Sequence, residues 1–177
     1  GRRRCGKTRL IEEVLQAFPA VYYVGDDREG PLQRTSLATE ISRQVPGFDR
    51  VEYPGWDALF ELWWKQAPAG SVLALDEFPS LVSSSREIPS VLQKRLDAGR
   101  ASGPHLLLAG SSQRMMQGLV LDRTAPLFGR ARDIMKIGPL PAGLVQPALK
   151  IRGAAASIEA YAVWGGMVDE PDDGEPF

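Results

Sequence analysis

The sequence begins with GRRRCGKT (residues 1–8), in which Gly1, Gly6, Lys7 and Thr8 fit the pattern GxxxxGK[ST]. Glycines at this spacing let a loop curl so that its backbone N–H groups point at phosphate oxygens, and the following helix adds its positive N-terminal end. Lys7 would bridge the β and γ phosphates of a nucleotide, and the Thr8 hydroxyl would bind Mg²⁺. The stretch therefore predicts a phosphate-binding loop that opens an α/β fold.

The chain is basic around this loop but not as a whole. Its 177 residues carry a formal net charge of −1, which gives no general attraction to nucleic acid or to anionic lipid. The basic residues near the loop are Arg2, Arg3, Arg4, Lys7 and Arg9. We expect Arg4, Cys5 and Arg9 to line the nucleotide site together with the loop glycines. Cys5 is interpreted either as a small loop residue or as a redox-sensitive thiol at a helix N-terminus.

Apolar residues alternate along the chain between helical and strand spacing. Helices are predicted at 8–18, around 37–45, at 56–65, from Pro89 to Gly99, at 115–120 and at 157–164, and strands at 20–24, 72–78, 105–109 and 133–137, with a short strand candidate at 50–53. Apolar strands that alternate with amphipathic helices predict a parallel sheet covered on both faces. In such a sheet, ligands bind at the carboxyl ends of the strands.

Two acidic residues, Asp76 and Glu77, lie at the carboxyl end of the apolar strand VLALDEF (72–78). We expect Asp76 to hold a water of Mg²⁺, because this ion prefers oxygen ligands and keeps several of its waters. Glu77 is the candidate general base that activates water for attack on the γ phosphate. The alternative is that the two residues only begin a solvated loop. Ser111 and Ser112 follow the next apolar strand, where they either contact the attacking water or a γ-phosphate oxygen, or simply form a turn.

Hydrolysis of a phosphoanhydride also needs positive charge on the γ phosphate, which an arginine finger supplies in cis or in trans. Arg130 and Arg132, in APLFGRARD, are the candidates, and a surface arginine is the alternative for both. His105 precedes a buried strand without a matching nucleophile or metal-ligand pattern, so we interpret it as structural.

Together, GRRRCGKTRLIEE, VLALDEFPSL, LLLAGSS, APLFGR and AYAVWGG resemble the prokaryotic, archaeal-type ATPase family that is related to the STAND and AAA P-loop NTPases. The resemblance implies a three-layer P-loop core of the additional-strand catalytic-glutamate (ASCE) type, with sheet order 5-1-4-3-2. It also implies ATP and Mg²⁺ as cofactors, and hydrolysis coupled to a conformational switch. Gly1 to Thr8 match the Walker A loop, Asp76 and Glu77 the Walker B pair, Ser111 and Ser112 the sensor position, and Arg130 the family's GR motif.

Compared with that family, the strand before the loop is missing and the residues after Gly166 lack the usual helix. The expected organisation is a core at 1–150 without its first strand, the start of a helical lid region at 151–168, and an acidic disordered tail at 169–177. We therefore expect a fragment truncated at both ends.

Three functions stay open: an ATPase, a nucleotide-gated switch with negligible turnover, and an inert piece. Expected partners are ATP, a second copy through Arg130, and an effector domain or protein acting through the absent C-terminal part. Nucleic acid would bind only through absent domains. No membrane contact is expected, and a cytoplasmic location is.

Overall fold

The computed structural model describes residues 6–99, 103–139, 141, 143–144 and 153–164. These residues fall into two compact units, one made of residues 1–10 and 135–177 and the other of Ile11–Ile134. The larger unit contains the sheet and most of the helices. The first unit contains the start of α1 (Lys7–Leu15) and the helix α8 (Ala154–Trp164).

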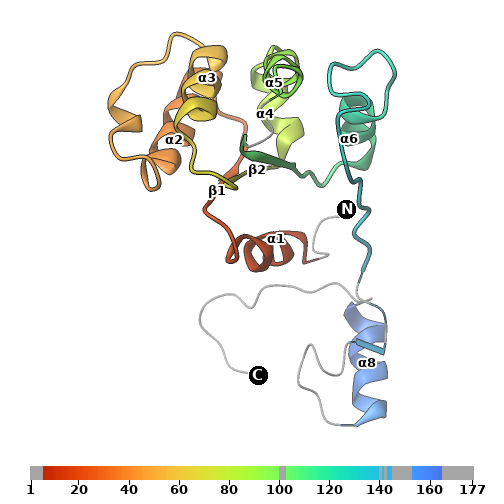
Figure 1. Cartoon of the computed structure of the whole chain (residues 1–177). Coiled ribbons are helices and arrows are strands. Elements are labelled where there is room, and N and C mark those ends of the chain that lie inside the picture. The colour runs from red at the N-terminus through yellow and green to blue at the C-terminus, as the bar shows by residue number, and fades with distance from the viewer. Residues whose placement is uncertain (1–5, 100–102, 140, 142, 145–152, 165–177) are drawn as a thin grey trace. The chain divides into compact units, whose positions relative to one another are not determined.

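A three-stranded parallel sheet forms the centre of the larger unit, with strand order β1-β2-β3 (Figure 1). The strands are β1 (Ala20–Val24), β2 (Val72–Asp76) and β3 (His105–Leu108). All five residues of β2 are buried, as expected for a central strand covered on both faces. The predicted parallel α/β fold is therefore confirmed. The structure shows three strands in the order β1-β2-β3, and the order 5-1-4-3-2 remains a prediction.

Most helices lie on one side of the sheet (Figure 1). These are α2 (Gly30–Ser42), α3 (Trp56–Gln66), α4 (Phe78–Ser84) and α5 (Ile88–Asp97), with α6 (Gln113–Val120) packed beside α4. They bury the main core, in which Trp56 and Trp63 of α3 are at most 1% exposed. Trp56 and Trp63 are therefore core residues.

The opposite face of the sheet carries a smaller core. Ile11 and Leu15 of α1 pack against Val72 and Ala74 of β2. These four residues are less than 9% exposed, so the part of α1 that belongs to the larger unit is anchored to the sheet. The helix predicted after the phosphate-loop motif is thus present, and it ends at Leu15 instead of at Phe18.

Two strand predictions are wrong. The stretch 50–53 contains the end of a 3₁₀ helix, η1 (Phe48–Arg50), because Gly47 adopts φ 87° before it and the Tyr53 hydroxyl donates to the Phe48 carbonyl at 2.7 Å. The stretch 133–137 forms no strand. Ile134 and Met135 in it are 60% and 74% exposed, and nothing in the described part of the chain pairs with its backbone.

One helix escaped the sequence analysis. Helix α4, with the sequence FPSLVSS, lies directly after Glu77 and has Pro79 in its first turn, where proline is tolerated. Three serines in seven residues weaken its helical signal, because serine favours caps and turns. Tertiary packing overrides that preference, since Phe78 and Leu81 are fully buried.

Candidate functional site

Asp76 is the last residue of β2, and its side chain is held at both oxygens. The carboxylate is almost fully buried, at 2% exposure. Its Oδ1 accepts the backbone N–H of Glu77 at 2.8 Å, and its Oδ2 accepts the Tyr22 hydroxyl at 3.1 Å. A buried carboxylate must be hydrogen-bonded to be stable. These two contacts fix the plane of the carboxylate at the carboxyl end of the central strand.

Glu77 follows Asp76 and has an unusual backbone. Its φ of 46° and ψ of 41° are left-handed, and among the described residues no other non-glycine has a positive φ. A side chain in this region costs about 1–2 kcal/mol relative to glycine. Such strain persists where the surrounding structure enforces it, and it gathers at functional sites. The turn that Glu77 makes separates β2 from α4 and brings its carboxylate to the sheet edge.

The Glu77 carboxylate is bonded to the segment after β3. Both the backbone N–H and the hydroxyl of Ser111 donate to Glu77 Oε2, at 3.2 Å and 3.0 Å. The neighbouring Ser112 has a different role, because its Oγ accepts the N–H of Met115 and caps helix α6. The two serines that the sequence treated alike are therefore distinct: one contacts the acidic pair and the other begins a helix.

Two glycines let these segments approach each other closely. The Gly25 N–H donates to the Asp76 carbonyl at 2.8 Å, and a Cβ at Gly25 would lie 2.9 Å from the Glu77 carbonyl oxygen. A Cβ at Gly110 would lie 2.7 Å from Pro79 Cδ. The segments after β1, β2 and β3 are thus packed together at one edge of the sheet, as parallel topology predicts.

The phosphate-loop residues belong partly to the described chain. Gly1, Arg4 and Cys5 lie outside the described residues. Gly6 has a φ of 69°, and α1 begins at the next residue, Lys7, which is 9% exposed. Thr8 is half-buried and Arg9 is exposed. A left-handed glycine that leads into a helix is the local geometry that the motif predicts.

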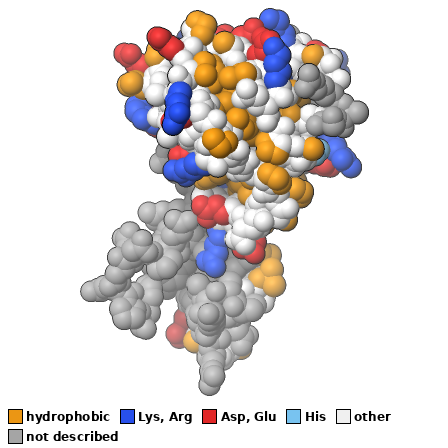
Figure 2. Space-filling view, turned by 60° about the vertical axis from the view of Figure 1, so that its left-hand side comes forward, with side chains coloured by type: hydrophobic (Ala, Val, Ile, Leu, Met, Phe, Trp, Pro, Cys, Tyr) orange, Lys and Arg blue, Asp and Glu red, His pale blue; other side chains and the backbone are white. Residues whose placement is uncertain are grey.

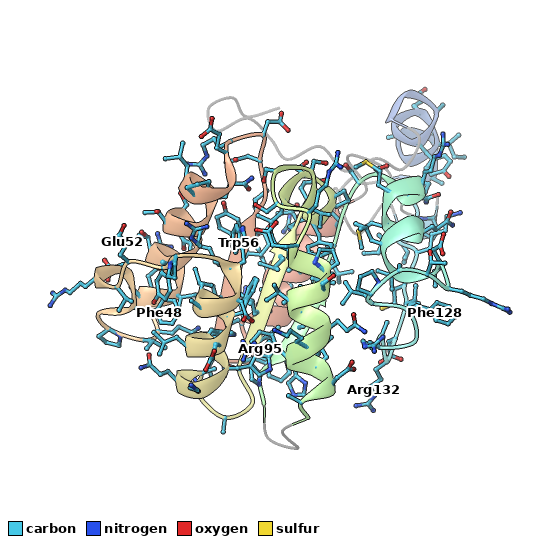
Figure 3. All side chains as sticks on the ribbon, turned by 90° about the horizontal axis from the view of Figure 1, so that it is seen from above. Phe48, Glu52, Trp56, Arg95, Phe128 and Arg132 are labelled. Atoms are coloured by element: carbon cyan, nitrogen blue, oxygen red, sulfur yellow. The ribbon has the colours of Figure 1, made fainter. Side chains whose placement is uncertain are left out.

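Arg130 is engaged at the far end of helix α5. Its Nε and Nη2 donate to the two carboxylate oxygens of Asp97, each at 2.7 Å, and its Nη1 donates to the carbonyls of Pro126 and Phe128. Figure 3 shows the segment with Phe128 and Arg132 beside α5. Helix α5 belongs to the connection from β2 to the parallel strand β3, so it runs in the opposite direction to the strands. Its last residue therefore lies toward the end of the sheet where the strands begin. Arg132 is almost fully exposed, at 96% of its side chain.

The side chains at the carboxyl edge suit a magnesium ion held mainly by its own waters and by phosphate. Within the described residues, no three His, Cys, Asp or Glu side chains group together as a metal cage. Asp76 offers hard carboxylate oxygens at the end of the central strand, which is the ligand type that this ion prefers. Magnesium is usually bound by one or two carboxylates plus substrate phosphates. Asp76 therefore fits this ion.

A hollow of about 800 Å³ runs beside β1 and α2, away from the predicted site residues. It is lined by Ala20–Val24, Arg28, Ser36, Glu40, Arg43 and Gln44. Its two arginines are paired, Arg28 with Asp26 and Arg43 with Glu40. In the described part of the Ile11–Ile134 unit, Figure 2 shows charged side chains of both signs among apolar ones, without a continuous basic surface on the face drawn. That face gives no support to nucleic-acid binding.

The chain is similar to proteins known from their sequence or their structure. No family model matches the chain. An uncharacterized protein of Methanocaldococcus jannaschii, MJECL04, is 27% identical over 173 residues, which covers 91% of this chain and 37% of that protein. Among solved structures, the Walker-type ATPase PABY2304 of Pyrococcus abyssi superposes with a TM-score of 0.66 at 16% identity, covering 94% of this chain and 57% of that one. Cdc6p from Pyrobaculum aerophilum gives 0.56 at 18%, covering 88% and 42%.

At such low identity the two structures establish the fold alone. The chain has the α/β fold of P-loop ATPases, which agrees with the motif at residues 1–8. The chain spans well under two thirds of the length of each of these proteins. Among the described residues, no helix is both long and apolar enough to cross a membrane.

Sequence analysis missed one residue of the site, Tyr22. The sequence AVYYV (20–24) predicts a buried strand, and neither tyrosine is expected to have a polar role. The signal was present in the alternation of side chains along a strand, which places Tyr22 and Val24 on one face and Tyr23 on the other. Val24 pairs with Asp76 in the sheet register, so Tyr22 is on the same face as that carboxylate. What the sequence could not show is that the hydroxyl reaches Asp76.

Proposed function

We propose that this chain is the nucleotide-binding core of a Mg²⁺-dependent ATPase. The observation that carries the proposal is the arrangement at the sheet's carboxyl edge: a buried Asp76 is followed by a left-handed Glu77, and both side chains are held by specific hydrogen bonds. The phosphate-loop motif, with its left-handed Gly6 and a helix that begins at Lys7, supplies the second support. The shared fold with a Walker-type ATPase is the third.

In this proposal, Gly1 to Thr8 and Arg9 bind the phosphates, and Lys7 bridges the β and γ phosphates. Bound Mg²⁺ neutralises charge that develops on the phosphates during transfer. Thr8 contributes a hydroxyl ligand for the ion, and Asp76 orients one of its waters.

Glu77 accepts a proton from the water that attacks the γ phosphorus, while the bond from that phosphorus to the bridging oxygen breaks. Ser111 holds Glu77 Oε2 with two hydrogen bonds and so restricts where the carboxylate lies. Ser112 acts as a helix cap in the described structure, so a direct role for it on the γ phosphate has less support than a role for Ser111.

An arginine-finger role for Arg130 belongs to the proposal only with a second copy of the chain. The four hydrogen bonds that Arg130 makes to Asp97, Pro126 and Phe128 would have to be released first. The effector domain or partner protein expected beyond this core is likewise a proposal.

The full sheet order 5-1-4-3-2 is part of the same proposal. Strand β3 is wholly apolar after His105, yet its three leucines are only half-buried. A continuous apolar run is typical of a strand with a neighbour on each side. We therefore expect a further parallel strand at the edge of β3 that faces away from β2.

A nucleotide-gated switch with little turnover is the second candidate. It is favoured by the engagement of Arg130 by Asp97, because the Arg130 side chain would have to move before it acts on a nucleotide. A switch of this kind would bind ATP with Mg²⁺ and retain it unhydrolysed.

Equilibrium titration of the full-length protein with ATP, with and without Mg²⁺, tests binding directly. We expect Lys7→Ala to weaken ATP binding at least tenfold, since Lys7 would contact two phosphates. Lys65→Ala is the matched control, because it removes an exposed lysine of helix α3 that has no place in the proposed site. Equal affinities in wild type and Lys7→Ala would reject the proposed site.

A further inference from the structure

Tyr22 connects strand β1 to the carboxylate at the end of β2. Its register partner is Ala74, and Asp76 is the next residue of β2 on the same face. The phenol spans this offset, and its hydroxyl donates to Asp76 Oδ2 at 3.1 Å. A tyrosine has the length for this contact with a rigid ring, so it holds the hydroxyl at a defined point with little loss of side-chain freedom.

The contact determines the orientation of the carboxylate. Asp76 Oδ1 is held by the N–H of the next residue, which the left-handed turn at Glu77 puts in place. The hydrogen bond from the Tyr22 hydroxyl to the other oxygen adds a side-chain restraint on rotation of the carboxylate about its Cβ–Cγ bond. The backbone donor cannot be removed by exchanging a side chain, but the phenol can.

We propose that Tyr22 is a positioning residue whose hydroxyl orients Asp76 toward the waters of Mg²⁺ and thereby sets the affinity of the site for the ion. The inference rests on the ATPase function proposed above and names one residue that its motifs do not contain. Partners that orient metal-binding groups typically change metal affinity about 10- to 100-fold when they are removed. Tyr22→Phe removes the hydroxyl and keeps the ring, so packing against the sheet is preserved.

The adjacent tyrosine supplies a matched control. Tyr23 is on the opposite face of the same strand, is 5% exposed, and donates its hydroxyl to Gln33 Oε1 at 3.4 Å. Tyr23→Phe therefore deletes the same atom from a neighbouring residue without touching Asp76. Both variants lose a tyrosine hydroxyl from β1, but only Tyr22→Phe loses a hydrogen bond to Asp76. The comparison therefore isolates the effect of that hydrogen bond.

The experiment titrates Mg²⁺ into the full-length protein with a fluorescent ATP analogue and measures binding by anisotropy. For Tyr22→Phe we expect the Mg²⁺ concentration at half-maximal binding to rise about tenfold, the lower end of the range for such partners. Binding of the analogue in EDTA should match wild type. Tyr23→Phe should match wild type in its Mg²⁺ dependence.

An unchanged Mg²⁺ dependence in Tyr22→Phe, or the same shift in Tyr23→Phe, would overturn the role of Tyr22. A loss of affinity in EDTA as large as that with Mg²⁺ would also overturn it, because the hydroxyl would then act on the whole site. Failure of the ATPase proposal would look different: wild-type protein itself would bind no analogue at any Mg²⁺ concentration.

Discussion

Carboxylates at the two ends of the parallel strands have different hydrogen-bond partners. At the edge where the strands end, Asp76 and Glu77 accept hydrogen bonds from a phenol, a serine hydroxyl and backbone N–H groups. Toward the other edge, both carboxylate oxygens of Asp97 accept hydrogen bonds from the guanidinium of Arg130. A bidentate arginine supplies charge as well as two hydrogen bonds, and it fixes the Asp97 carboxylate in a structural contact.

This difference distinguishes the proposed site from a structural connection. The strained turn at Glu77 also belongs to the first edge, and strain of this kind marks residues that function retains at the expense of stability. The Asp97–Arg130 pair joins α5 to the segment after α6. Within that segment, Arg130 also donates two hydrogen bonds to the carbonyls of Pro126 and Phe128. Mutations at the two edges should therefore affect different properties.

The same substitution at each edge gives the largest contrast. Asp76→Asn should raise the Mg²⁺ requirement for ATP hydrolysis about 10- to 100-fold, because an amide orients a magnesium-bound water less well than a carboxylate. Asp97→Asn should leave the requirement unchanged. Steady-state phosphate release as a function of Mg²⁺ measures both, and equal behaviour of the two variants would remove the distinction between the edges.

Ser111 should affect the rate and not the affinity. Ser111→Ala removes one of the two hydrogen bonds to Glu77 Oε2 and should lower kcat about tenfold, the scale of one bond to a charged group, with KM for ATP unchanged. Ser111→Thr keeps the hydroxyl and should restore most of the rate. If KM rises in Ser111→Ala while kcat stays, Ser111 contacts the nucleotide instead of Glu77.

The strain at Glu77 predicts an effect on stability. Because glycine adopts a left-handed backbone without penalty, Glu77→Gly should be more stable than Glu77→Ala by about 1 kcal/mol. Both variants lose the carboxylate, so their difference isolates the backbone. Urea unfolding measures it, and a Glu77→Ala variant as stable as Glu77→Gly would show that the turn is relaxed.

The smallest effects are expected from the Asp97–Arg130 pair. Hydrogen bonds from Arg130 hold the pKa of Asp97 below its ordinary value of 3.8. The pair therefore stabilises the fold above that pH, and the contribution is lost as pH falls through the lowered pKa. Arg130→Ala should lose more stability at pH 7 than Asp97→Asn, because it also removes two hydrogen bonds to backbone carbonyls. The part of each loss that comes from the ion pair should shrink in acid. A loss of turnover confined to Arg130→Ala would instead indicate an arginine finger.

The sequence predicted the features of this fold that depend on local pattern. The buried strand VLALD, the helix with Trp56 and the helix with Pro89 in its first turn all follow from spacing and propensity. Position along the strand also placed Asp76 and Glu77 at its end. These features are predictable because buried apolar residues recur along a helix or strand with the period of that element.

Pairing across the fold could not be predicted in the same way. A strand exists only where its backbone finds a partner, and for that reason the apolar stretch at 133–137 was misread. The contacts of Ser111 with Glu77 and of Tyr22 with Asp76 join residues 34 and 54 positions apart. Serine after a strand reads equally well as a turn, and tyrosine in a strand reads as core, so their roles appear only when the fold brings them to the acidic pair.

Single-turnover hydrolysis of ATP by the full-length protein tests the central claim most directly, with wild type compared with Glu77→Gln. The glutamine keeps the size of the side chain and an acceptor oxygen for Ser111, but it cannot take a proton. With general-base catalysis worth about 10²- to 10⁴-fold, we predict that Glu77→Gln binds ATP with Mg²⁺ as wild type does and hydrolyses it at least 100-fold more slowly. Equal rates in the two proteins would contradict the assignment of this edge as an ATPase site.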